Sequence, residues 1–121
     1  MYLFDTYALI EIIKGNKNYS KYIDSTPIIN KFILTELTYW MIRDYGFDKA
    51  SLIADQYNKY VKEIDLEVIK EAMLFRYLHK KQKLSMIDCI GYIMAKKLGL
   101  KFLTGDKEFE KFDNVEFVKW H

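Results

Sequence analysis

An aspartate directly follows a short apolar run and directly precedes a helical pattern at two distant places in the chain. Residues 1–4 form an apolar run typical of a strand, Asp5 comes next, and residues 6–14 carry apolar side chains at helical spacing. Near the other end, residues 100–103 predict a second short strand, and a turn after it carries Asp106 into another short helical stretch. Ligands of open α/β sheets bind outside the carboxyl ends of strands, so these two acids converge if their strands are neighbours.

Two further acids fall on predicted helices. Ser85, followed three residues later by Asp88, has the form of a capping box, which puts Asp88 in the first turn of a helix that Gly99 closes. Glu36 lies on the helix expected over residues 32–44, beside its apolar stripe. Each acid alone has a structural explanation as a cap or a surface residue. It is the combination of the acids that indicates a site.

The rest of the chain alternates strands with helices. Further helices are expected at residues 19–23, 47–60 and 66–81, and further strands at residues 28–29, 61–64 and 115–120, the last at a sheet edge. Such alternation predicts an α/β fold with a mostly parallel sheet and helices on both faces. Because only a short loop separates the helices at 32–44 and 47–60, they should form a projecting antiparallel hairpin.

Length and charge limit the classes of protein to consider. The 121 residues predict one domain over residues 1–121. The formal net charge is only +2, from 19 Lys plus Arg against 17 Asp plus Glu, so overall charge does not indicate a nucleic-acid binder. Any such binding must come from the local distribution of charge.

The few cysteines and histidines exclude several kinds of site. The single cysteine, Cys89, permits no internal disulfide and is expected to be a small buried hydrophobe. His79 and His121 are the only histidines, which argues against a histidine-based triad or zinc site. Without a run of 18 apolar residues or a secretory signal pattern, the chain is predicted to be cytoplasmic, with no membrane segment.

The acids predict a site for Mg²⁺ or Mn²⁺, since hard divalent cations take carboxylate and water oxygens as ligands. Asp5, Asp88 and Asp106 are the expected ligands, and Glu36 is expected to tune the site. Without a cation, carboxylates packed together raise one another's pKa values and weaken the fold. A bound metal would polarise a phosphoryl oxygen and lower the pKa of a water, so phosphodiester hydrolysis is the predicted reaction class.

Lysines flank two of the acids. Lys80, Lys81 and Lys83 precede Asp88, and Lys107 follows Asp106. One interpretation is a solvated helix end whose lysines complement the helix dipole. The other is a cationic rim that holds an RNA phosphate backbone beside the acids.

Four short motifs occur in order along the chain: LFDT at residues 3–6, LTEL at 34–37, SMID at 85–88 and FLTGDKEF at 102–109. In their order, their spacing and the total length they resemble PIN-domain ribonucleases and, more narrowly, the VapC toxins of bacterial and archaeal toxin–antitoxin pairs. The resemblance covers essentially the whole chain.

The resemblance implies a three-layer α/β/α sandwich with a projecting helical hairpin and a metal-dependent endoribonuclease activity. It also implies a small antitoxin as protein partner and a homodimer. Thr104 matches a hydroxyl residue that lines the family's pocket, and Thr6 follows the first acid as a Ser or Thr often does. The implied acidic quartet is Asp5, Glu36, Asp88 and Asp106.

Three alternatives stay open at the level of sequence. A PIN-like scaffold could bind RNA without cleaving it. An RNA-processing nuclease would carry the same residues as a toxin. A haloacid-dehalogenase-type phosphatase also begins with a strand and Asp5-Thr6, but its motif requires a second aspartate where Tyr7 stands.

Tyrosines gather on or near the predicted hairpin, at positions 39, 45, 57 and 60, in a chain with ten tyrosines. A group of exposed aromatic side chains indicates an interface. Together with the resemblance, Tyr39, Tyr45, Tyr57 and Tyr60 predict a homodimer.

Overall fold

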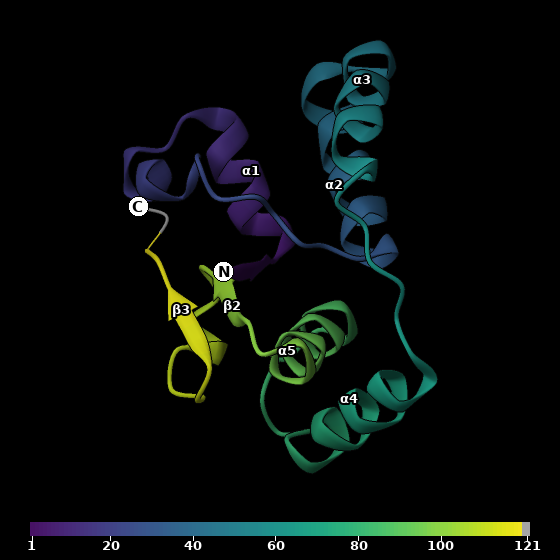
Figure 1. Ribbon diagram of the computed structural model, residues 1–121, viewed down its shortest axis with the longest axis vertical. Helices are drawn as coiled ribbons and strands as arrows, with labels where there is room; N and C mark the ends of the chain where they lie inside the picture. The colour runs from purple at the N-terminus through teal and green to yellow at the C-terminus, as the bar shows by residue number, and fades with distance from the viewer. Residues whose placement is uncertain (120–121) are drawn as a thin grey trace.

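The computed structural model describes residues 1–119 and contains a three-stranded sheet in the order β1-β2-β3, with both pairs parallel (Figure 1). The strands are β1 (Tyr2–Phe4), β2 (Lys101–Thr104) and β3 (Val115–Phe117). Leu3 lies opposite Phe102 in the register of β1 and β2. The strands that precede Asp5 and Asp106 are therefore direct neighbours, and their carboxyl ends lie at the same edge of the sheet.

Helices cover both faces of this sheet. In chain order they are α1 (Thr6–Lys14), the 3₁₀ helix η1 (Lys17–Tyr22), α2 (Lys31–Tyr45), α3 (Phe47–Asn58), α4 (Leu66–Leu78), α5 (Met86–Leu98) and the 3₁₀ helix η2 (Lys107–Phe109). Both α1 and α5 pack on the sheet, from opposite faces, and α4 packs on the outside of α5 (Figure 1). This arrangement confirms the predicted α/β sandwich.

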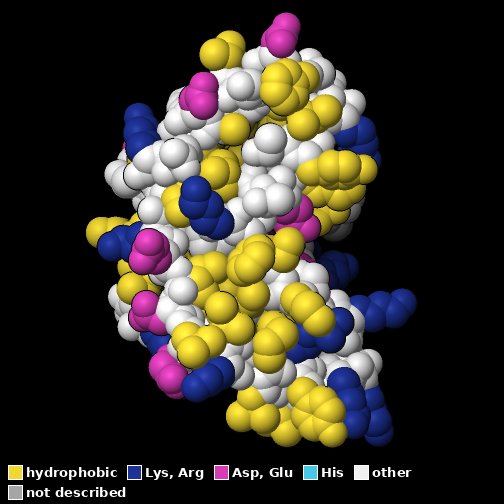
Figure 2. Space-filling model, turned by 90° about the vertical axis from the view of Figure 1, so that its right-hand side faces the viewer, with side chains coloured by type: hydrophobic (Ala, Val, Ile, Leu, Met, Phe, Trp, Pro, Cys, Tyr) yellow, Lys and Arg dark blue, Asp and Glu magenta, His cyan; other side chains and the backbone are white. Residues whose placement is uncertain are grey.

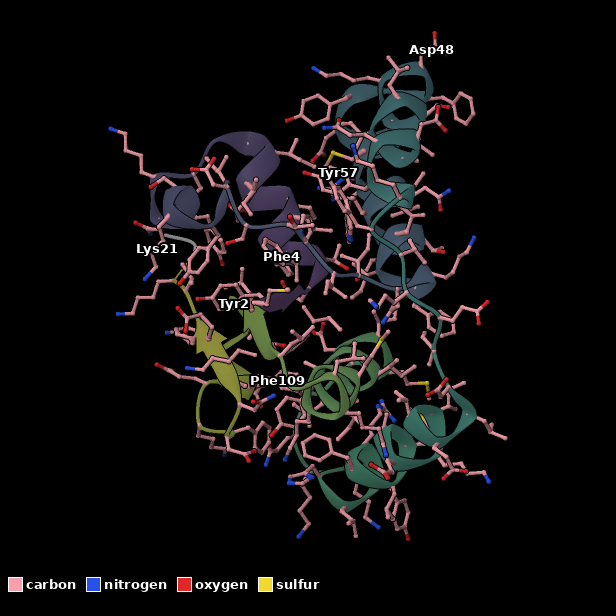
Figure 3. All side chains as sticks on the ribbon, in the orientation of Figure 1. Tyr2, Phe4, Lys21, Asp48, Tyr57 and Phe109 are labelled. Atoms are coloured by element: carbon pink, nitrogen blue, oxygen red, sulfur yellow. The ribbon has the colours of Figure 1, made fainter. Side chains whose placement is uncertain are left out.

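The α2–α3 pair forms the predicted hairpin. It projects from the body of the protein, with Asp48 at its far tip (Figure 3). Asn30 begins α2 by accepting the Ile33 N–H on its side-chain oxygen at 2.9 Å, and Gly46 separates the two helices with a φ of +85°. Because the chain reverses at one glycine, the two helices lie antiparallel and in contact.

Two predicted strands are shorter than expected. Residues 28–29 and 61–64 take part only in isolated parallel bridges, Leu3 with Ile28 and Ile29 with Val61. Asn30 follows Ile29 at once and caps α2, so the chain turns away from the sheet before a second residue pair can form. The prediction of a short strand in each segment is wrong, although both segments make single bridges along the sheet.

Several predicted ends also shift. The helix expected to reach residue 81 ends at Leu78, because the backbone of His79 leaves the helical conformation, with φ at −110° and ψ at 28°. The helix expected over 47–60 ends at Asn58. The last strand ends at Phe117, and Trp120, at the end of the predicted strand, lies outside the described residues.

The middle of α5 forms the centre of the core, with residues 89–95 all buried. Gly91 lets β2 approach closely, since a Cβ there would lie 2.8 Å from Cε1 of Phe102. Cys89 is buried as predicted, and burial together with the neighbouring Asp88 raises the pKa of its thiol to about 11.

Two of the four hairpin tyrosines are not surface groups. Tyr39 and Tyr45 are exposed, but Tyr57 and Tyr60 pack against the core with ring centroids 5.9 Å apart. Tyr57 lies between α1 and the hairpin in Figure 3. The prediction of one exposed tyrosine group is wrong for this pair, because both side chains fill the space beneath the hairpin.

Within residues 1–119, none of the helices has the length and apolar character needed to cross a membrane.

Candidate active site

One hydroxyl links the ends of β1 and β2. Thr104 donates to Oδ2 of Asp5 at 2.5 Å and accepts the backbone N–H of Asp106 at 3.0 Å. Asp5 is only 1% exposed, and its Oδ1 accepts the Ala8 N–H at 2.7 Å as the N-cap of α1. The strand pairing thus fixes two acids and one threonine at a single edge of the sheet.

The other two acids come from helices. Glu36 on α2 accepts a short hydrogen bond on Oε1 from the Thr6 hydroxyl at the start of α1. Asp88 lies in the first turn of α5, where its N–H donates to Ser85 Oγ at 3.0 Å. The hydrogen bond from the Asp88 N–H to the Ser85 hydroxyl, which the predicted capping box requires, is therefore formed. The Asp88 carboxylate itself interacts with the charges of the other acids.

Burial is the main influence on the pKa values of Asp5 and Asp88. It raises the pKa of Asp5 to about 7, against the lowering effect of the hydrogen bonds from Thr104 and Ala8; the charges of Asp106 and Glu36 raise it further. Burial also raises the pKa of Asp88 well above its ordinary value, followed by the charges of Asp5, Asp106 and Glu36. Ionising Asp5 and Asp88 together is thus unfavourable without a compensating cation.

The donor set suits a hard divalent cation, although the side chains are not arranged around one. Among residues 1–119, no group of three or more Asp, Glu, His or Cys side chains has the geometry to hold a metal ion. Both oxygens of Asp5 accept protein hydrogen bonds, and Oδ1 of Asp106 accepts the Glu108 N–H at 2.9 Å. The fit rests on the chemistry of the side chains, because carboxylate oxygens are the ligands that Mg²⁺ and Mn²⁺ prefer and a cation would offset the repulsion between these charges.

A cavity of about 160 Å³ opens beside the acids. Its lining includes the predicted residues Thr6, Glu36 and Asp88 and also residues that the sequence interpretation did not assign to the site: Tyr7, Ile10, Trp40 and Ser85. Their positions next to, or one helical turn from, predicted site residues could have located three of these four residues. Tyr7 follows Thr6, Ile10 is one turn further along α1, and Trp40 is one turn after Glu36.

The predicted lysines lie outside this cavity as far as residues 1–119 describe its walls. Lys80 and Lys81 are exposed in the turn after α4, where the Lys80 ammonium lies 4.5 Å from the centroid of the Tyr77 ring. Lys83 is exposed two residues before Ser85, and Lys107 is exposed at the start of η2, directly after Asp106.

Comparison with known proteins identifies the fold family. The family model of the PIN domain matches residues 2–115, nearly the whole chain. The chain belongs to the PIN domain family. Membership argues against the phosphatase alternative and agrees with the motifs around Asp5, Glu36, Asp88 and Asp106.

Two solved structures share this PIN fold over their full length. One is a toxin–antitoxin complex from Klebsiella pneumoniae, with 18% identity, a TM-score of 0.75 and 96% of each chain covered. The other is VapC20 of Mycobacterium tuberculosis, a toxin that cleaves the sarcin-ricin loop, with 17% identity, a TM-score of 0.79 and 98% of each chain covered. No curated protein matches the chain by sequence.

Proposed function

We propose that this PIN domain is a metal-dependent endoribonuclease that hydrolyses RNA phosphodiesters. The observation that carries the proposal is the gathering of Asp5, Glu36, Asp88 and Asp106, from two strand ends and two helices, into one electrostatically interacting group. The shared fold with a sarcin-ricin-loop-cleaving toxin supports RNA as the substrate class.

Each residue of the site has a role in this proposal. Asp5, Asp88 and Asp106 would hold Mg²⁺ or Mn²⁺, which when bound polarises a phosphoryl oxygen and activates a water. Thr104 orients Asp5 by donating to its Oδ2, and Thr6 orients Glu36 in the same way. Burial of Asp5 excludes bulk water from the inner side of the site.

In this proposal the lysines bind the RNA phosphate backbone without regard to its base sequence. Lys80, Lys81 and Lys83 lead into α5, and Lys107 follows the Asp106 turn, so cations flank the acids on two sides. Phosphates of a strand crossing the acids would pair with these ammonium groups.

The direct test is cleavage of single-stranded and structured RNA by the purified protein with Mg²⁺ or Mn²⁺. We expect cleavage with either metal and none in excess chelator, because the proposed reaction activates its water through the bound metal. RNA binding without cleavage under every metal condition would instead favour the non-catalytic scaffold. Whether the enzyme is a toxin or an RNA-processing nuclease is decided by the effect of its expression on growth.

A small antitoxin is the proposed protein partner, supported by the fold shared with a chain of a toxin–antitoxin complex. Its C-terminal segment would lie between α5 and the hairpin and place a basic side chain against Asp5, Asp88 or Asp106. Partner and metal should then compete. The partner's affinity should fall in saturating Mn²⁺ and with Asp88→Asn, and an affinity indifferent to both would move inhibition elsewhere on the surface.

A homodimer is the proposed assembly. Large apolar side chains are exposed along the hairpin and α4, and Figure 2 shows hydrophobic side chains gathered on the face that carries these helices. They are Tyr39, Ile42, Tyr45, Phe47 and Leu52 on the hairpin and Leu66, Leu74 and Leu78 on α4. Light scattering should give twice the chain mass; the mass of a single chain over a wide concentration range would contradict the proposal.

A further inference from the structure

A groove leads away from the carboxylates between α1 and α2. The cavity beside Glu36 and Asp88 adjoins a second hollow of about 140 Å³, and both are lined by Tyr7, Ile10 and Trp40. The second hollow ends at Glu11, Lys14, Arg43 and Asp44. Because Tyr7, Ile10 and Trp40 line both hollows, the two hollows lie side by side; together they are called the groove, whose near end is lined by Glu36 and Asp88.

The walls of this groove offer flat surfaces. Tyr7 is 57% exposed at the start of α1. Trp40 is half-buried, and the Arg43 guanidinium lies over its ring at 4.3 Å from the centroid. Aromatic rings and guanidinium planes are the groups on which unpaired nucleobases stack.

Charge at the far end of the groove favours a neutral group over a phosphate. Lys14 and Arg43 carry two positive charges, Glu11 and Asp44 carry two negative charges, and Arg43 Nε already donates to Asp44 Oδ1 at 3.1 Å. Since these formal charges cancel, the hollow has no net attraction for an anion. A flat, uncharged ring that stacks on Tyr7 and Trp40 suits it better.

We propose that this groove is a nucleobase subsite, in which Tyr7 and Trp40 hold the base of a nucleotide next to the phosphodiester positioned at the carboxylates. This inference rests on the proposed endoribonuclease function, and the presence of Glu36 and Asp88 at the near end of the groove is what assigns it to RNA. The subsite makes cleavage depend on a base at one position next to the cut.

The test compares two RNA oligonucleotides that share one cleavage site, one intact and one abasic at the neighbouring nucleotide. For the parent protein, the intact oligonucleotide should have a kcat/KM roughly 5- to 100-fold higher, the range that base–aromatic stacking provides. Tyr7→Leu should lose most of this preference by lowering activity on the intact RNA alone, and Tyr7→Phe should retain it. Tyr77→Leu, which removes an equally exposed tyrosine from α4, is the matched control and should behave as the parent.

Tryptophan fluorescence measures base binding in the groove separately from RNA cleavage. Trp40 and Trp120 are the only tryptophans, so in Trp120→Phe the emission reports on Trp40 alone. Intact RNA should quench this emission in chelator, where no cleavage occurs, and the RNA abasic at the same nucleotide should quench it less. Cleavage without any base preference or Trp40 quenching would overturn the subsite and leave the nuclease standing, whereas absence of both RNA binding and cleavage would overturn the two together. A Tyr7→Leu variant that weakens only partner binding would assign the groove to protein.

Discussion

Replacing Asp5 by asparagine should reduce RNA cleavage roughly 100-fold or more while the protein stays folded. The amide keeps the size of the carboxylate and an oxygen that can accept the Ala8 N–H, so the N-cap of α1 can persist. It removes the negative charge that a divalent cation requires at this position, and loss of a metal ligand or of its orienting partner has effects of this size. The measurement is kcat/KM on a single-stranded RNA with saturating Mn²⁺.

Asp55→Asn is the matched control for this variant. Asp55 is exposed on α3 and does not line the cavity beside the acids, so its loss changes the net charge by the same amount without touching the site. Calorimetric titration should show weakened Mn²⁺ binding for Asp5→Asn and unchanged binding for Asp55→Asn. Full cleavage activity in Asp5→Asn would remove Asp5 from the catalytic group.

Local sequence patterns were enough to place three of the four acids on their strands and helices, because each of the three lies next to a strand end or a helix cap. Asp5 and Asp106 follow strands, and Asp88 follows a capping serine, so a short window of residues determines where each one sits. The sheet order that makes β1 and β2 neighbours is a long-range property. The sequence left this order as a condition for the convergence of Asp5 and Asp106, and the structure supplies it.

What the sequence did not reveal depends on tertiary distances. The segments at Ile28, Ile29 and Val61 form only single bridges, because strand pairing stops where α2 begins. Local β propensity does not show that a helix start will interrupt the pairing. The groove formed by Tyr7 and Trp40 joins two helices that are distant in sequence. The groove is formed by the packing of α1 on α2, and the sequence of either helix alone does not predict that packing.

The metal-free protein should be more stable at pH 5 than at pH 8. The pKa of Asp5 is about 7 in the folded chain, above its ordinary value of 3.8, so the folded state disfavours the ionised carboxylate. The contribution of Asp5 to stability is therefore fully present below about pH 4 and is lost as the pH rises through the folded pKa. Asp88 shifts in the same direction, whereas the lowered pKa of exposed Asp113 acts only below this window.

For Asp5 alone the difference in the free energy of unfolding between pH 5 and pH 8 is roughly 2 to 3 kcal/mol. Urea denaturation in excess chelator at several pH values measures it, and Asp5→Asn should show a flatter dependence because the amide does not titrate. Asp55→Asn should follow the parent.

Divalent metal should reverse the loss at high pH. A ligand that binds only the folded state stabilises it by about 2.7 kcal/mol at 100 times its dissociation constant, so saturating Mn²⁺ at pH 8 should restore most of the stability seen at pH 5. At pH 5 the same Mn²⁺ should do less, because protons compete for the carboxylates. If stability in chelator instead rose from pH 5 to pH 8 and Mn²⁺ had no effect, Asp5 and Asp88 would be stabilising as helix-capping anions, and the metal site would have to be abandoned.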